Sequence, residues 1–135
     1  GGRVPAIRTR SIVATISVAL ITCASAPANA ATSQQPDGAA AVAALEAATE
    51  AALQDAAHST KIVKPKLRIV SAEPVTWSDG SLGCPQEDTM YSQALVPGFR
   101  IVIKAGERQL DYHASADGGL VLCPPERAMP PVAKY

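Results

Sequence analysis

The feature that most constrains this chain is a pair of cysteines, Cys84 and Cys123, in a region too short to bury a large core. Two cysteines of an exported chain pair by default. Their bridge would close a loop of about 40 residues, for which loop-closure entropy gives roughly 4 kcal/mol of stabilisation. Since a domain of about 60 residues gains little from burial alone, we expect this disulfide to organise the fold.

Residues 1–30 have the three-part pattern of a secretory signal peptide. Arg3, Arg8 and Arg10 precede an uncharged, mostly apolar run over residues 11–24, and small residues lead up to Ala30. The apolar run is shorter than the roughly 20 residues that span a membrane. We therefore expect cleavage after Ala30 and export to the periplasm or the extracellular space.

A lipoprotein is the alternative. The residues before Cys23 resemble a lipoprotein processing box, which would place a lipid on that cysteine. Thr22 fits this box poorly, because Gly, Ala or Ser usually precedes the lipidated cysteine. Cleavage after Ala30 would remove Cys23 and leave Cys84 and Cys123 as the only thiols.

The charge distribution argues against a nucleic-acid partner. Three of the twelve Lys and Arg residues, and none of the twelve Asp and Glu residues, precede residue 31. Residues 31–135 therefore carry nine basic and twelve acidic groups, a net charge of −3. Recognition of nucleic acid needs a basic surface.

An Ala-rich helix is expected to follow the leader. Residues 31–60 are predicted to be a polar linker and then a helix from Asp37, a plausible N-cap, to about His58. Its narrow apolar stripe consists of Val42, Leu45, Ala52, Leu53 and Ala56. Because the stripe is thin, two alternatives stay open: weak docking on the domain, or a stalk.

Alternating apolar and polar residues predict strands over residues 99–104 and 108–114. Asp117-Gly118 is a strong hairpin signal, and a third strand is expected over residues 119–123, which completes an antiparallel meander. The side chains expected to face the core are Phe99, Ile101, Ile103, Leu110 and Tyr112. Those expected to face outward are Arg100, Lys104, Gln109, Asp111 and His113.

A fourth strand is expected over residues 66–70, with Leu67 and Ile69 on one face. Pro74 cannot donate a ladder hydrogen bond, so this strand should end near Ala72 or lie at an edge. The predicted fold class is thus α+β: an N-terminal Ala-rich helix, then an antiparallel sheet of about four strands with one disulfide. Residues 61–124 would form the domain, and residues 125–135 a disordered Pro-rich tail.

Four segments carry a distinctive set of residues: Val75–Pro85, Met90–Ile101, Asp111–His113 and Leu122–Pro124. They resemble an uncharacterised family of small exported bacterial proteins. Its members read approximately W-x-D-G-S-L-G-C-P, then Y-T-Q-A-L-V-P-G-Y-R-I, then Y-H, then L-C-P. This chain departs from that pattern at Ser92 and Phe99, where the family has Thr and Tyr. The resemblance covers about residues 75–124 and implies an intact exported domain, without implying a reaction.

Residues 77–98 lack clear periodicity, and a loop this long in a small domain is usually functional or specifically stabilised. Trp77 has two interpretations: a core residue beside the disulfide, or, with Tyr91, an exposed aromatic anchor. The candidate binding residues are Trp77, Asp79, Tyr91, Gln93 and His113. We expect a non-enzymatic envelope protein that binds a protein, peptide or cell-wall partner through this loop.

Two other functions stay open. The segment Cys84–Met90 could act as a protease inhibitor that offers Met90 to a protease pocket, since a pinned loop is preorganised for binding. A small hydrolase or thiol enzyme around Cys84, Ser81 and His113 is the second, although no G-x-S-x-G elbow is present and a nucleophilic thiol would have to be free.

No catalytic residue, metal site or cofactor is predicted. A zinc site around Cys84, Cys123, His113 and Asp111 would lack paired C-x-x-C or H-x-x-x-H spacing. The acidic residues Asp79, Glu87 and Asp88 match no calcium loop.

Overall fold

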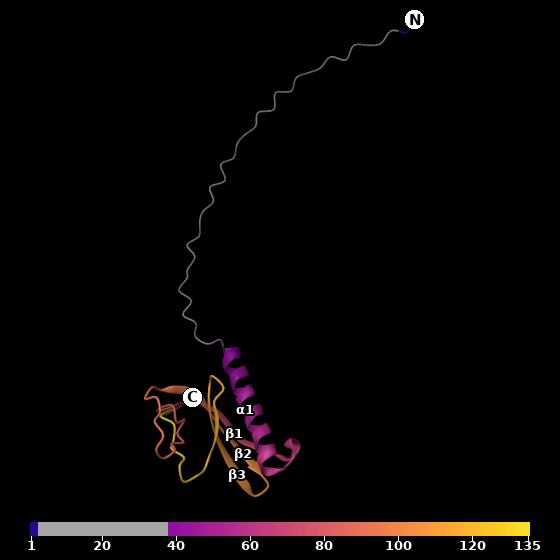
Figure 1. Cartoon of the computed structure of the whole chain (residues 1–135). Coiled ribbons are helices and arrows are strands. Elements are labelled where there is room, and N and C mark those ends of the chain that lie inside the picture. The colour runs from indigo at the N-terminus through magenta and orange to yellow at the C-terminus, as the bar shows by residue number, and fades with distance from the viewer. Residues whose placement is uncertain (3–37) are drawn as a thin grey trace. The chain divides into compact units, whose positions relative to one another are not determined.

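A computed structural model of the chain describes residues 1–2 and 38–135 (Figure 1). The expected signal peptide, its cleavage after Ala30, the lipid site at Cys23 and the helix cap at Asp37 lie outside these residues. The elements are α1 (Gly38–Thr60), η1 (Lys64–Lys66), β1 (Arg68–Trp77), β2 (Val96–Ala105), β3 (Arg108–Ser115), β4 (Leu120–Cys123) and β5 (Ala133–Lys134). The strands form one antiparallel sheet in the order β4-β3-β2-β1-β5. The α+β class is therefore confirmed, with a short fifth strand beyond the four expected.

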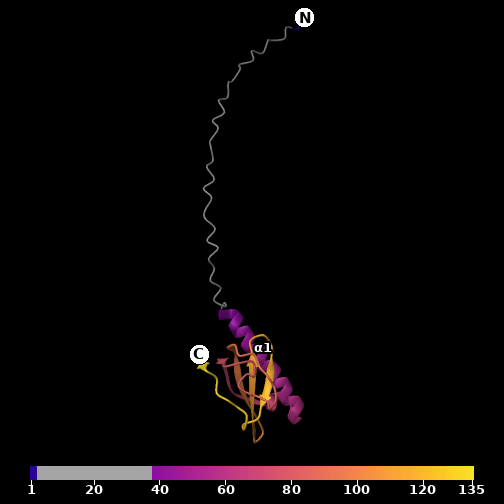
Figure 2. The same ribbon diagram turned by 60° about the vertical axis from the view of Figure 1, so that its left-hand side comes forward.

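Helix α1 docks on one face of the sheet (Figure 2). Ala52 and Ala56 are fully buried against Ile101 and Ile103, because a methyl group lets the helix approach the strands closely. The hydroxyl of Tyr112 donates a hydrogen bond of 2.7 Å to Oδ2 of Asp55 on the helix. Burial, together with this bond, raises the pKa of Tyr112. The stalk alternative is therefore wrong for this helix.

The end of the helix turns the chain back toward the sheet. Lys61 has φ = 60°, the left-handed conformation that commonly terminates a helix. The chain then crosses the helix end through η1 and enters β1. Ile62 is partly buried against the core between helix and sheet.

Strand β1 runs through Pro74 to Trp77, so the prediction that it ends near Ala72 is wrong. The carbonyls of Pro74 and Thr76 both accept hydrogen bonds from the C-terminal segment, from Tyr135 at 3.4 Å and Val132 at 2.9 Å. In an antiparallel strand the N–H and C=O of one residue point to the same side. The missing N–H of Pro74 therefore faces away from β2, and the pairing of β1 with β2 loses no hydrogen bond.

The C-terminal segment is ordered, so the prediction of a disordered tail over residues 125–135 is wrong. The carbonyl of Pro124 accepts hydrogen bonds from the N–H groups of Arg127 (3.0 Å) and Ala128 (3.2 Å), which form a turn. The N–H of Met129 then donates to the carbonyl of Gly83 at 2.8 Å, and β5 pairs with β1. Three prolines remove donors from residues 125–135, but β1 and the loop supply carbonyls for N–H groups that remain.

Part of the second face of the sheet is also covered, which overturns one predicted orientation. His113 was expected to face solvent and is fully buried, because residues 78–84 and Trp77 lie over it. Ile69 lies on the expected inward face, as the register partner of the buried Ile103, but β1 is the edge of the sheet at this point and 48% of Ile69 is exposed. A β-bulge between Ile69 and Ser71 shifts the register of β1 against β2 at this point.

Among the described residues, no helix combines the length and the apolarity that crossing a membrane requires.

The close approach of α1 to the sheet generates a prediction. Ala52→Leu would insert three carbons into a filled interface, and we expect it to lower the free energy of unfolding by about 1–3 kcal/mol. Ala43→Leu, on the exposed side of the same helix, should change it by less than about 0.5 kcal/mol. Urea denaturation of both variants measures the difference, and equal effects would contradict the docked helix.

Candidate functional site

The loop between β1 and β2, residues 78–95, is the candidate site and is called the anchored loop below. Its first part is joined to β4 by the disulfide between Cys84 and Cys123, whose Cα atoms are 5.7 Å apart. Both cysteines are buried. The predicted pairing is confirmed, and it fixes one side of the loop on the sheet face opposite α1.

Residues 79–84 form a tight turn at the base of the anchored loop. Oδ1 of Asp79 accepts hydrogen bonds from the N–H of Ser81 (2.8 Å) and from its hydroxyl (2.5 Å), as short polar side chains often do in turns. Gly83 has φ = +68°, and a Cβ there would lie 2.8 Å from the carbonyl oxygen of Met129. Only glycine fits this position without displacing the C-terminal segment.

Trp77 is fully buried, so it belongs to the core and cannot be an exposed binding anchor. Its indole N–H donates a hydrogen bond of 3.0 Å to the carbonyl of Ala114 on β3, although Trp77 itself lies on β1. The ring reaches across β2 at Gly98, where a Cβ would lie 2.9 Å from the indole nitrogen. Gly98 therefore lets one side chain link three strands, and Val75 and Leu82 complete this apolar cluster.

His113 joins the sheet to the anchored loop. Its ring stacks on Trp77 with centroids 4.3 Å apart. Its Nδ1 lies 2.6 Å from the carbonyl oxygen of Leu82, and because a carbonyl can only accept, Nδ1 carries the hydrogen. Nε2 lies 3.4 Å from Oδ1 of Asp111 and has no other polar partner. His113 is thus a buried structural link, with no exposed surface for a ligand.

Asp111 and Arg100 form the charged side of this link. The guanidinium of Arg100 donates two hydrogen bonds to the Asp111 carboxylate, at 3.0 and 2.7 Å. Burial alone would raise the pKa of Asp111, but the contacts with His113 and Arg100 outweigh it and lower the pKa from 3.8 to about 2. Asp111 therefore stays ionised wherever the protein is folded at ordinary pH.

The outer part of the anchored loop, residues 86–91, is called the outer lobe below and is solvent-exposed except for Tyr91, which is half-buried. The Tyr91 hydroxyl closes it by accepting a hydrogen bond of 3.1 Å from the N–H of Gln86. The side-chain amide of Gln93 donates to the Tyr91 carbonyl at 3.2 Å, and the N–H of Gly80 donates to the Ser92 carbonyl at 2.8 Å. Met90 is 98% exposed.

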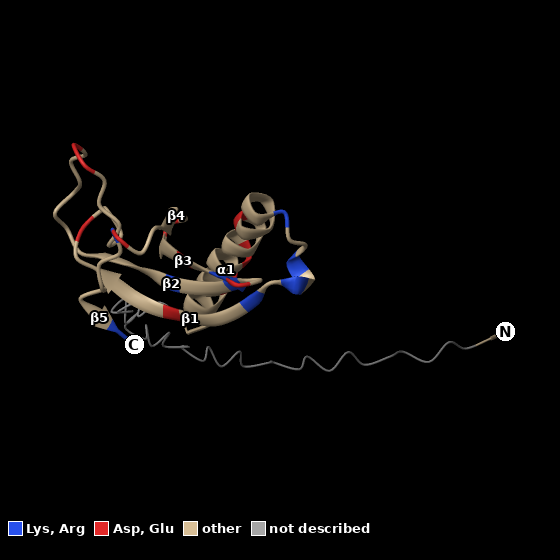
Figure 3. Ribbon diagram, turned by 90° about the horizontal axis from the view of Figure 1, so that it is seen from below, with Lys and Arg blue, Asp and Glu red and all other residues tan. Residues whose placement is uncertain are grey.

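Figure 3 shows acidic residues at the tip of a loop that extends away from the sheet. The outer lobe contains two adjacent acidic residues, Glu87 and Asp88, both exposed. Between them and Tyr91 stands Met90, so the lobe offers an apolar side chain beside negative charge.

The residues of the predicted catalytic alternatives lie near one another, but each is engaged in a structural contact. Cys84 is held in the disulfide, so it provides no thiolate. The Ser81 hydroxyl donates to Asp79, and the Nδ1 of His113 is engaged by Leu82. Among residues 38–135, no group of three or more His, Cys, Asp or Glu side chains is arranged to hold a metal ion.

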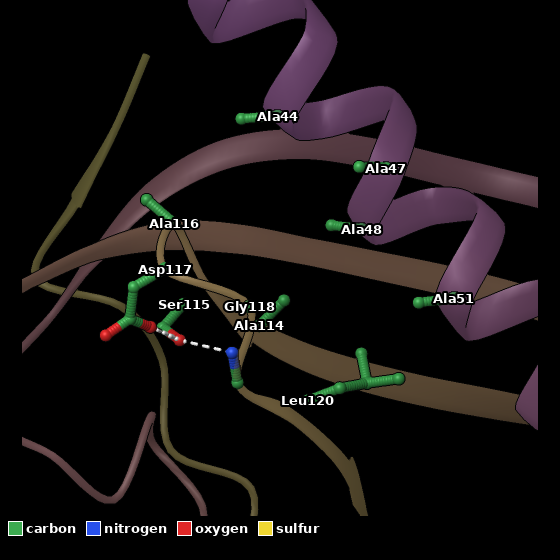
Figure 4. A pocket seen from close by; sticks show the side chains of 11 residues that line it. Ala44, Ala47, Ala48, Ala51, Ala114, Ser115, Ala116, Asp117, Gly118 and Leu120 are labelled. Carbon is green, nitrogen blue, oxygen red and sulfur yellow. Dashed lines mark hydrogen bonds between the residues drawn. The ribbon is translucent and has the colours of Figure 1, made fainter.

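A pocket of about 250 Å³ lies between α1 and the turn that joins β3 to β4 (Figure 4). It is lined by small residues: Ala44, Ala47, Ala48, Ala51, Ala114, Ser115, Ala116, Asp117, Gly118, Gly119 and Leu120. The Ser115 hydroxyl bonds to Asp117 and accepts from the N–H of Gly119 at 2.8 Å. These polar groups satisfy one another, so the pocket defines no ligand chemistry.

The predicted binding residues therefore separate into two groups. Trp77 and His113 lie in the core, and Asp79 shapes the turn, whereas Tyr91 and Gln93 support the outer lobe. The sequence reasoning gave no role to Gly98 or Met129, which respectively admit the indole ring and hold Gly83. Glycine just before a strongly alternating strand is the signal that could have revealed Gly98.

Fold and site together define a small disulfide-linked α+β domain with a projecting, covalently anchored loop. The chain belongs to a family described as a domain of unknown function (DUF8738), which matches residues 49–123 and so includes the second half of α1, the anchored loop and both cysteines. No curated protein and no solved structure matches the chain.

The disulfide gives the second prediction. Replacing both cysteines by serine should lower the free energy of unfolding by about 4 kcal/mol, because the unfolded chain regains the entropy of a loop of about 40 residues. Urea denaturation of the Cys84→Ser/Cys123→Ser variant, and of the wild type with and without reductant, checks this. A loss below about 1 kcal/mol would show that the loop is held without the bridge.

Asp111 gives the third prediction. Because its folded pKa is depressed, it stabilises the fold above pH 4, and this contribution of about 2 kcal/mol is lost as the pH falls from about 4 to about 2. Asp111→Asn should be less stable at pH 6, with the difference from wild type shrinking toward pH 2. Urea denaturation across this range measures it. The matched Asp88→Asn change, at an exposed carboxylate, should change the free energy of unfolding by less than about 0.5 kcal/mol at pH 6.

Proposed function

We propose that this protein is an exported, non-enzymatic binding domain that engages a protein or peptide partner through its outer lobe. The observation that carries this proposal is the position of Met90, which is 98% exposed on a lobe whose base is fixed by a disulfide and several hydrogen bonds. An exposed methionine adapts to an apolar socket on a partner. A loop held in one conformation loses little entropy on binding.

The environment of the aromatic residues supports a protein partner over a cell-wall glycan. A glycan-binding surface would use an exposed aromatic ring as a platform, but Trp77 is buried and the Tyr91 hydroxyl is engaged by Gln86. What the outer lobe presents is an unbranched apolar chain with two carboxylates beside it. This combination suits an apolar pocket with a basic rim.

Export is part of the proposal, and two observations support it. The leader pattern over residues 1–30 is typical of secretion. A structural disulfide of the kind formed by Cys84 and Cys123 persists in oxidising compartments such as the periplasm. The lipid-anchored form through Cys23 is the alternative within this proposal.

We further propose that the sequence motifs shared with the small exported proteins are a signature of the loop base. The first motif contains Trp77, Gly83 and Cys84, and the second contains Gly98. Each of these residues has a packing role that other side chains cannot fill. The motifs would then describe how the outer lobe is held, and the lobe itself would vary.

The backbone of the lobe favours this function over the protease inhibitor. Inhibitors that occupy a protease cleft present several residues in extended conformation around the residue that enters the pocket. Here Glu87 and Asp88 form a turn, and Asp88 has φ = 57°, two residues before Met90. The lobe is closed rather than extended at that point.

The fourth prediction tests the outer lobe directly. A photoreactive amino acid placed at position 90 should capture a discrete partner in the producing cells, and the same group at Val42, which is 56% exposed on α1, should not. Unlabelled wild type and Val42→Asp should compete for this capture, whereas Met90→Asp should compete at least tenfold less well. Since Met90 contacts little, Met90→Asp should change stability by less than about 0.5 kcal/mol.

Capture of the same species from both positions, or equal competition by Met90→Asp, would contradict the proposal. If the captured species is a protease and the purified protein inhibits it, the inhibitor function replaces the one proposed.

A further inference from the structure

The basic residues of the domain gather at the end of the sheet where β1 begins. Of the nine Lys and Arg residues after residue 30, six lie here: Lys61, Lys64, Lys66, Arg68, Lys104 and Arg108. This set is called the basic end below. Figure 3 shows the blue segments of η1 and of the start of β1 side by side.

The strand register brings these residues together from separate parts of the chain. Arg68 on β1 is the direct partner of Lys104 on β2, and Ala105 pairs with Arg108 on β3. The turn between β2 and β3 approaches the segment after the helix, since a Cβ at Gly106 would lie 3.9 Å from Cδ1 of Ile62. The cations thus gather at one end of the sheet, with Arg68 and Lys104 on the face opposite α1 and Arg108 on the face that α1 covers.

Few acidic groups neutralise the basic end. Lys64 is paired with Glu50 on α1. Asp55 accepts the hydroxyl of Tyr112, and Glu107 lies in the exposed turn between β2 and β3. The basic end is therefore positive, although residues 31–135 as a whole carry a net charge of −3.

Apolar side chains are exposed among these cations. Val63 is 60% exposed, Ile69 48% and Val70 56%, and all three lie within the segment that carries Lys64, Lys66 and Arg68. Exposed apolar residues interspersed with Lys and Arg are typical of surfaces that bind anionic membranes, because the cations meet headgroups while the apolar groups enter the interface.

The geometry also orients the domain. Strand β1 begins at the basic end with Arg68 and ends at Trp77, next to the anchored loop. Its ten residues separate the two ends by roughly 30 Å. The acidic residues of the outer lobe, Glu87 and Asp88, belong to the far end and would be repelled by an anionic surface.

We propose that the basic end binds peripherally to an anionic bilayer and so holds the outer lobe away from the membrane. This inference does not depend on the function proposed for the outer lobe. It gives a function to the basic end, which is not part of the candidate site.

Vesicle flotation tests it with the purified protein and its variants. The wild type should float with phosphatidylglycerol-containing vesicles, should not float with pure phosphatidylcholine, and should be released as salt rises. Lys66→Gln/Arg68→Gln should lower the partition coefficient roughly 30-fold, because each cation near an anionic surface raises this coefficient about fivefold. The matched double change Arg127→Gln/Lys134→Gln, elsewhere on the surface, should lower it less than twofold.

All these variants carry the same N-terminal segment, so its own affinity for vesicles cancels in the comparison. Lys66 and Arg68 are exposed, and thermal melting verifies that both double variants fold. Val63→Ser should weaken binding without changing its salt dependence. Met90→Asp should bind vesicles as the wild type does, which separates this inference from the function of the outer lobe.

Equal loss in both double variants, equal flotation with phosphatidylcholine, or no flotation would overturn the inference. Tighter binding to soluble polyglutamate than to the vesicles at the same charge concentration would show that the basic end recognises an acidic polymer, and would overturn it as well.

Discussion

The Cys84–Cys123 disulfide is the constraint on which the rest of the molecule depends. A sheet with one helix buries only one of its faces, and the apolar cluster of Val75, Trp77 and Leu82 lies on the other. The disulfide holds irregular chain over that cluster, where no regular element is available. A loop thereby becomes the second layer of the fold, and the sheet gains a core on both sides.

On the face opposite α1, a row of paired charged side chains lies between the part that the anchored loop covers and the part that it leaves open. In the row across the strands, Lys134 lies 3.5 Å from Glu73, which is the register partner of Arg100, and Arg100 pairs with Asp111. His113 ends the row beneath the loop. The bidentate, partly buried pair of Arg100 and Asp111 is stronger than the exposed pair of Lys134 and Glu73. The row connects the C-terminal strand to the loop base through three central strands.

The sequence predicted the features that follow from periodicity or from cysteine count. It did not predict the features that depend on contacts with residues far along the chain. The strand with Phe99, Ile101 and Ile103 and the disulfide follow from periodicity and from cysteine count. The burial of His113 depends on a loop some 30 residues earlier, and no alternation pattern reports that its outer face is covered. The predictions for Pro74 and for the C-terminal segment were wrong for one reason. Proline has no N–H to donate, and this matters only where the fold requires a hydrogen bond from that position. The long irregular loop was predictable from its lack of periodicity, but its division into a packed base and an exposed lobe was not.

That division has a consequence for how such a domain can change its specificity. Substituting Gly83 or Gly98 would displace the C-terminal segment or the Trp77 ring, so the base tolerates little change. The outer lobe is held by few hydrogen bonds, chiefly the closing bond from Gln86 to Tyr91, and its residues 86–90 are exposed. Stability is therefore concentrated in residues that no partner touches, while the residues that a partner would touch contribute little to stability. A fold arranged in this way can acquire a new partner without losing the structure that presents it.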